Sequence, residues 1–149
     1  MNKRAFPRKI WMLALLGVIA MILLYPFETT VVPEWKTRIV DEVGNPMRMT
    51  GVREVWRHYT IESTSHEEDS ITDNDGYVTF PRRMVRGSLL GRVGKRLLNV
   101  FNVHATFGPH AYLVVLHGPS LPDSFVTIND TYTAGQPLPT QVILKRMPH

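Results

Sequence analysis

The hydrophobic pattern begins with an uninterrupted apolar run near the N-terminus. Residues Ile10 to Phe27 carry no charged side chain, and only Gly17 and Pro26 weaken helix formation among them. As a helix these eighteen residues would extend about 27 Å, close to the ~30 Å hydrocarbon core of a bilayer. A helix on a soluble protein normally keeps a polar face, and this segment has none. We therefore predict a transmembrane helix over Ile10–Phe27, with the following residues facing lipid: Ile10, Trp11, Leu15, Ile19, Leu23 and Phe27.

The flanks of this run favour a permanent anchor over a cleaved signal peptide. Four basic residues precede it, Lys3, Arg4, Arg8 and Lys9. The run is longer than the ~7–15 residues of a typical signal-peptide core, and no small-residue cleavage site follows it. We expect an uncleaved signal-anchor, with cleavage near Tyr25 as the alternative.

After Pro33 the pattern changes to short runs rich in Val, Ile, Tyr, Phe and Thr, separated by Gly, Pro, Asn and Asp. Several runs alternate apolar and polar residues, which is typical of strands with one buried face. Turn-forming residues gather at 42–46 and 73–76. The pattern predicts an all-β antiparallel sandwich of seven or eight strands, with a small barrel as the competing architecture. The predicted strands are Lys36–Asp41, Val52–Ile61, Asp69–Thr72, Tyr77–Phe80, Asn102–Thr106, Ala111–Leu116, Phe125–Ile128 and Gln141–Lys145.

One segment departs from the strand pattern. Residues 82–101 contain six basic side chains and no acidic one, and their apolar residues follow helical spacing. This predicts a basic amphipathic helix inserted between strands. It could lie on the membrane interface, close one edge of the sandwich, or dock on a partner protein. The candidate contact residues are Arg86, Leu89, Arg92, Val93, Lys95, Arg96 and Leu97.

The charge distribution predicts an orientation. Of 17 Lys and Arg, four precede the apolar run, and the remaining 13 are balanced by the 13 Asp and Glu. The positive-inside rule then makes residues 1–9 cytoplasmic, 10–27 the anchor and 28–149 an extracytoplasmic domain. We expect an inner-membrane protein with a periplasmic domain, whose partners are the lipid bilayer and an envelope protein. The neutral domain argues against a nucleic-acid partner.

The residues offer weak support for metal or catalytic chemistry. The chain has no cysteine, so disulfides, thiolate metal sites and cysteine nucleophiles are excluded. Asp73 and Asp75 are too few for a calcium loop and favour a hairpin turn. The acidic stretch 62–75 is interpreted as a solvated loop or as a partner for the basic segment. We predict no cofactor and no metal. The alternative is a metal-binding protein or hydrolase that uses His104, His110 and His117, with His58 as a candidate third group.

Three segments resemble a known family. Ile39–Pro46 reads as a strand ending in a D-x-x-G-x-P turn, Gly51–Trp56 as a G-x-x-V strand, and Thr72–Pro81 as a T-D-x-D-G-Y hairpin. Together they resemble the carboxypeptidase regulatory-like family, and Val142–Lys145 suits its closing strand. The resemblance implies a transthyretin-like sandwich in a module that supports folding, adhesion or ligand presentation without catalytic residues. The basic insertion departs from that family.

An enzymatic relative of that fold is less similar. The hydroxyisourate hydrolases share the transthyretin fold and end in a Tyr-Arg-Gly-Ser type C-terminus, whereas this chain ends Leu144-Lys145-Arg146-Met147-Pro148-His149. We therefore expect a non-catalytic module with a binding or structural role in the cell envelope, for an unknown ligand.

Overall fold

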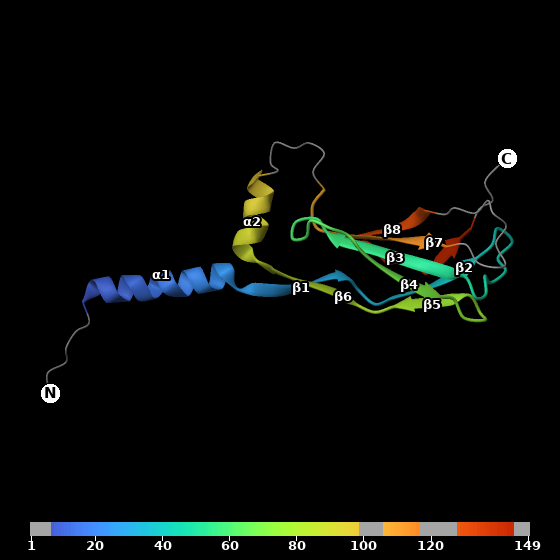
Figure 1. Cartoon of the computed structure of the whole chain (residues 1–149), viewed down its shortest axis with the longest axis horizontal. Helices are drawn as coiled ribbons and strands as arrows, with labels where there is room; N and C mark the ends of the chain where they lie inside the picture. Colours follow the sequence, from blue (N-terminus) through green and yellow to red (C-terminus); the bar gives the residue numbers. More distant parts are fainter. Residues whose placement is uncertain (1–6, 99–105, 117–127, 145–149) are drawn as a thin grey trace, which may run out of the picture.

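A computed structural model describes residues 7–98, 106–116 and 128–144, with two helices and nine strands in these ranges. Helix α1 precedes a domain of strands, and helix α2 lies at the junction between α1 and that domain (Figure 1). In chain order the elements are α1 (Arg8–Leu24), β1 (Pro26–Val32), β2 (Trp35–Val40), β3 (Gly51–His58), β4 (His66–Ile71), β5 (Tyr77–Phe80), β6 (Arg83–Ser88), α2 (Leu89–Leu98), β7 (Pro109–Val115), β8 (Ile128–Thr133) and β9 (Gln141–Ile143).

The strands form three sheets, which together make a sandwich-like β-domain. Their orders are β4-β3-β7-β8, β5-β2-β9 and β1-β6. The mostly-β prediction is confirmed. The expectation of a purely antiparallel sandwich is wrong, because β9 pairs with β2 in parallel. The strand count is also wrong, since the described residues hold nine strands and two of them, β1 and β6, were not predicted.

Three predicted strands fall partly outside the described residues. One is Gln141–Lys145, whose residue 145 lies there and within which β9 ends at Ile143. Residues 102–105 of the predicted strand Asn102–Thr106 lie there, and Thr106 itself is not in a strand. Of the predicted strand Phe125–Ile128 only Ile128 is described, and it begins β8.

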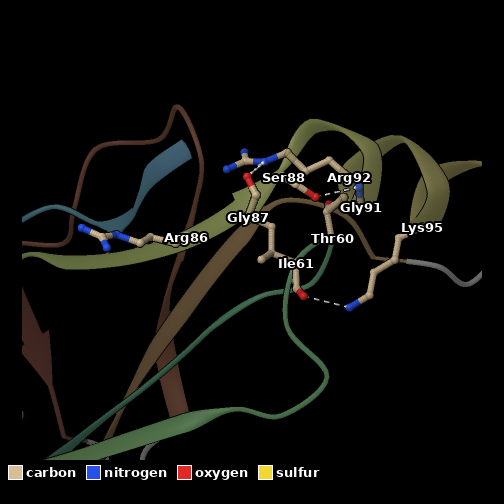
Figure 2. A pocket seen from close by; sticks show the side chains of 8 residues that line it. All are labelled: Thr60, Ile61, Arg86, Gly87, Ser88, Gly91, Arg92 and Lys95. Atoms are coloured by element: carbon tan, nitrogen blue, oxygen red, sulfur yellow. Dashed lines mark hydrogen bonds between the residues drawn. The ribbon is translucent and has the colours of Figure 1, made fainter. Parts of the chain in front are cut away.

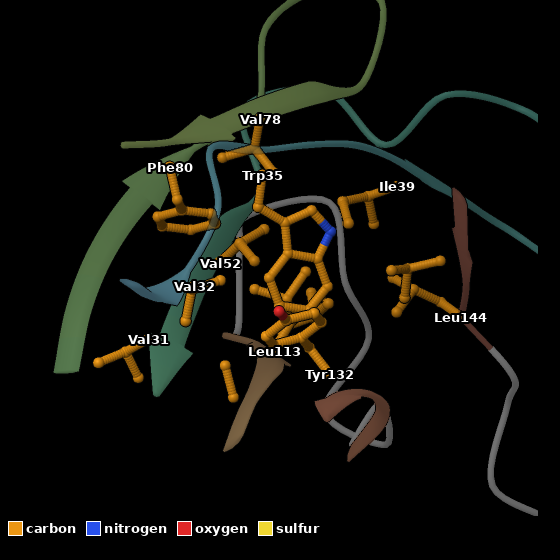
Figure 3. Close-up of a cluster of buried hydrophobic side chains, with 13 residues drawn as sticks. Val31, Val32, Trp35, Ile39, Val52, Val78, Phe80, Leu113, Tyr132 and Leu144 are labelled. Carbon is orange, nitrogen blue, oxygen red and sulfur yellow. The ribbon is translucent and has the colours of Figure 1, made fainter. Parts of the chain in front are cut away.

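The hydrophobic core lies where the sheets face one another (Figure 3). Trp35 of β2 is fully buried at its centre, and its indole Nε1 donates to the carbonyl oxygen of Pro139 at 2.9 Å. Phe80 comes from β5 and Leu113 from β7, so the core joins both larger sheets. Alternate residues of β5 and β7 supply core side chains, as the period-two pattern predicts, whereas β1 contributes the consecutive Val31 and Val32.

Two turns take the conformation that their residues predict. Gly44 and Gly76 have φ of +94° and +79°, a region that glycine enters without steric cost. The Asp73 carboxylate accepts from the backbone N–H groups of Asp75 and Tyr77 at 2.9 and 2.8 Å. Asp73 is therefore a turn residue, as interpreted. The turn does not close a hairpin, because β4 and β5 belong to different sheets.

Alanine at these two glycines is expected to affect stability unequally. At Gly44 a Cβ atom meets nothing within 4 Å, so the left-handed backbone alone costs about 1–2 kcal/mol. At Gly76 the Cβ atom would lie 2.7 Å from the carbonyl oxygen of Ile39, which adds a backbone clash. Urea unfolding of the full chain should show Gly76→Ala as the more destabilised variant, and equal losses would contradict the clash.

The pairing of β1 with β6 explains where the helices lie. Pro26 pairs with Ser88 at the end of this ribbon. Helix α1 ends at Leu24, and α2 begins at Leu89. The ribbon therefore delivers both helices to the same end of the β-domain, and α2 lies against α1.

Both predicted helices differ from the observed ones in their bounds. The apolar helix predicted over Ile10–Phe27 ends at Leu24, because Pro26 restricts Tyr25 to the extended conformation that it adopts. Among the described residues, no helix combines the length and the apolar character needed to cross a membrane. The helix predicted within 82–101 is observed only from Leu89, since Arg83–Ser88 form β6.

Candidate functional site

Helix α1 presents an apolar surface on every side. Its predicted contact residues Ile10, Trp11, Leu15, Ile19 and Leu23 are all exposed, and no residue of the helix is buried. Phe27, predicted as part of the same helix, is exposed in β1 instead. The rings of Tyr25 and Phe27 pack edge to face with centroids 5.0 Å apart, which continues the apolar surface toward α2.

Helix α2 faces the β-domain with its basic side. Arg92 and Lys95 are half-buried, whereas Leu90, Val93 and Leu97 are exposed. Leu89 and Leu98 are also exposed, and Arg96 is exposed near them. A helix packed on a soluble domain buries its apolar stripe and exposes its charges; α2 has the reverse orientation. The interpretation that α2 uses its apolar side to close the sandwich is therefore wrong.

Specific hydrogen bonds hold α2 in this orientation. Arg92 donates to the carbonyl oxygens of Gly87 and Phe27 at 3.3 and 3.2 Å, and also to the Thr29 hydroxyl. Lys95 donates to the carbonyl oxygen of Ile61 at 3.0 Å. These bonds attach α2 to β1 and to the segment that follows β3.

Ser88, the last residue of β6, caps the start of α2. Its hydroxyl accepts from the backbone N–H of Gly91 at 3.2 Å, which is a capping contact. Arg86, which lies two residues before Ser88 in β6, forms an ion pair with Glu28 of β1 at 2.6 Å. Both partners of that pair are largely exposed.

An open cavity of about 230 Å³ lies between the basic side of α2 and the β-domain. Figure 2 shows Arg92 and Lys95 of α2 beside it, with the hydroxyls of Thr60 and Ser88. Arg86 of β6 also lines the cavity, but its guanidinium extends away from these residues. The pKa of nearby His58 is lowered chiefly by burial and further by the charges of Arg92 and Lys95, while Glu62 opposes this lowering.

A buried ionic cluster connects β6 to the four-stranded sheet. Glu54 of β3 is fully buried, and Arg83 donates to it at 2.8 Å and to Glu68 at 2.7 Å. The Arg83 guanidinium also lies 4.1 Å from the centre of the Trp56 ring. Burial raises the pKa of Glu54, and the bond from Arg83 opposes that rise. The sequence signal for this cluster is the position of Glu54, two residues after Val52 and therefore on the same buried face of β3.

The acidic stretch makes ion pairs within the β-domain. Glu67 and Asp69 of β4 pair with Arg53 of β3 at 2.9 and 2.6 Å. Because residues 66–71 form β4, the interpretation of this stretch as a loop is wrong there. The expected pairing with residues 82–101 occurs through Arg83 alone among the described contacts, and Arg83 belongs to β6.

The histidines proposed as metal ligands are described only in part. His104 and His117 lie outside the described residues. His110 packs against Tyr59, with ring centroids 6.1 Å apart. In the part of the chain that the structure describes, no three His, Asp or Glu residues are grouped as metal ligands.

Comparisons with protein-family models, with curated proteins and with solved structures found no match. The resemblance to the carboxypeptidase regulatory-like family therefore stays a prediction.

Proposed function

We propose that this chain is a membrane-attached protein. In this proposal α1 inserts into the bilayer, the apolar side of α2 rests in the interfacial layer, and the β-domain lies outside. The observation that carries it is the orientation of α2, whose leucines are exposed beside α1 while Arg92 and Lys95 face the β-domain. Exposed apolar surface costs about 25 cal/mol per Å² in water, so both helices favour an apolar environment.

The arrangement of the two helices fits this environment. Helix α1 projects along the long axis of the molecule, and α2 lies across that axis at the junction with the β-domain (Figure 1). If α1 follows the membrane normal, α2 lies in the plane of the interface, as amphipathic interfacial helices do. The exposed Tyr25 and Phe27 lie at the same junction, and aromatic residues are enriched at that depth.

The proposed orientation places the β-domain on the extracytoplasmic side. The four basic residues before the apolar run favour a cytoplasmic N-terminus, while residues 28–149 have no net formal charge. We infer a non-catalytic role in which the β-domain is presented to a partner in the cell envelope. A carboxypeptidase regulatory-like sandwich belongs to the same proposal.

The absence of cysteine allows a direct test of where α2 lies. Leu97→Cys in the full chain creates a single site for an environment-sensitive fluorophore such as NBD. With the chain reconstituted in vesicles, we expect blue-shifted emission that lipids carrying a nitroxide on the acyl chain quench. Ile71→Cys on β4, where the side chain is also exposed, is the matched control and should report water.

The outcomes separate two surroundings for α2. Quenching at residue 97 and not at residue 71 supports the interfacial position. Blue-shifted emission at residue 97 that lipid nitroxides fail to quench would show a protein partner on the apolar side and overturn the proposal. Emission at residue 97 as water-like as at residue 71 would also overturn it.

A further inference from the structure

The cavity beneath α2 has the chemistry of a phosphate site. Arg92 and Lys95 of α2 line it, and Arg86 of β6 is a third cationic residue of its lining. Guanidinium groups bind phosphate oxygens through paired, charge-assisted hydrogen bonds. The hydroxyls of Thr60 and Ser88 accept from the backbone N–H groups of Gly108 and Gly91, so each keeps an O–H that can donate to an anion.

The arginines of the cavity retain charge for a ligand. Within the described residues Arg92 bonds only neutral oxygens, those of Gly87, Phe27 and Thr29, so no carboxylate neutralises it there. Arg86 pairs with Glu28, but both side chains are largely exposed. Exposed pairs of this kind contribute ~0–1 kcal/mol, which a phosphate can readily replace.

The position of the cavity suggests the source of the phosphate. The cavity lies on the basic side of α2, where Arg92 and Lys95 line it (Figure 2), whereas Leu90, Val93 and Leu97 of the same helix are exposed. If the leucines rest among acyl chains, the cavity lies on the outer side of α2, at the depth of lipid headgroups. Basic residues at that depth attract anionic lipids.

We propose that this cavity binds the phosphate of an anionic phospholipid headgroup. The inference rests on the proposed membrane attachment, and it adds a specific lipid site to the nonspecific insertion of the two helices. The bound headgroup joins β6, α2 and the segment after β3, which fixes the β-domain relative to the membrane surface.

The test uses the full chain in micelles of a neutral detergent. Phosphatidylglycerol is titrated into the micelles, and the thermal unfolding midpoint of the β-domain is followed by near-UV circular dichroism. A ligand that binds the folded state alone raises this midpoint in a saturable way. Parallel titrations use phosphatidylcholine and inorganic phosphate at 0.3 M salt, a concentration on the order of those that screen exposed charges.

Three variants separate the cavity from general electrostatics. Arg92→Gln should raise the phosphatidylglycerol concentration for half the effect by about tenfold or more, as loss of a charged hydrogen bond requires. Arg86→Gln tests the same site without removing a contact of α2, and should act in the same direction. Arg96→Gln removes one charge from α2 outside the cavity, and should shift the titration by less than about threefold at this salt.

Each outcome decides the proposal. A saturable rise with phosphatidylglycerol that both cavity variants weaken and Arg96→Gln preserves supports it. If phosphatidylcholine raises the unfolding midpoint equally, the site does not select anionic lipids. If inorganic phosphate raises the midpoint as much as phosphatidylglycerol does, the ligand is not a lipid headgroup. Unchanged titrations for Arg92→Gln and Arg86→Gln, or an equal shift for Arg96→Gln, overturn the site. If only the phosphate site fails, the fluorophore at residue 97 still reports the bilayer. If the membrane attachment itself fails, that fluorophore reports water or a protein partner.

Discussion

Arg83→Met is expected to lower the free energy of unfolding by about 3–5 kcal/mol, because it leaves the carboxylate of Glu54 buried without its cation. Glu54 is fully buried, and the Arg83 side chain is only 11% exposed. The guanidinium also contacts Trp56 and Glu68, so its removal breaks one connected cluster. Urea unfolding of the full chain in detergent at pH 8 measures this loss.

The loss should depend on pH in a definite direction. Burial raises the folded-state pKa of Glu54 above its value in the unfolded chain, about 4.3. A group of this kind favours the folded state below its unfolded pKa, and that contribution disappears as the pH rises through the folded pKa. Without Arg83 the pKa rises further, so the deficit of the variant should be smaller at pH 5 than at pH 8. A deficit that grows on acidification would contradict this account.

Two controls isolate the buried charge. Glu54→Gln/Arg83→Met removes both charges and should recover much of the lost stability, since a buried ion pair contributes little net free energy. Arg53→Met breaks a pair with Asp69 on the exposed side of the same sheet, where both partners have side-chain exposures of 37% or more. That loss should stay below about 1 kcal/mol.

Local patterns predicted the elements whose determinants are local. Strand β5 has the predicted bounds Tyr77–Phe80, because the preceding Asp73–Gly76 turn and the alternation of Val78 with Tyr77 act within a few residues. The helical spacing of Leu89, Val93 and Leu97 likewise identified α2. These signals depend on neighbours in sequence.

Strands β1 and β6 were missed because their pairing is distant in sequence. Pro26 opens β1 and pairs with Ser88, and nothing near either residue indicates the other. The six basic side chains of 82–101 suggested one continuous helix. In the structure Arg83 forms an ion pair with Glu54, Arg86 forms one with Glu28, and both arginines belong to β6. The reversed orientation of α2 also depends on distant oxygens, those of Phe27 and Ile61, which no spacing rule identifies.

If α1 inserts into the bilayer as proposed, Leu15→Arg/Ile19→Arg should remove most of the chain from membranes. The two residues lie one turn apart on α1, and both are exposed in the isolated chain. Moving an arginine into the centre of a membrane-embedded helix costs about 2.5–3.5 kcal/mol, so the pair costs more than about 5 kcal/mol. Expression of the full chain followed by fractionation and a carbonate wash of the membranes measures the shift.

The matched control makes the same chemical change elsewhere. Val43→Arg/Ile71→Arg replaces two exposed apolar residues of the β-domain, 86% and 61% exposed. All four positions are exposed, so neither double variant removes core packing, and near-UV circular dichroism should be the same for both. The membrane-bound fractions of the two variants then differ only if α1 is inserted in the bilayer and the β-domain stays in water. A Leu15→Arg/Ile19→Arg chain that resists carbonate as well as the control would show that α1 is not held by lipid.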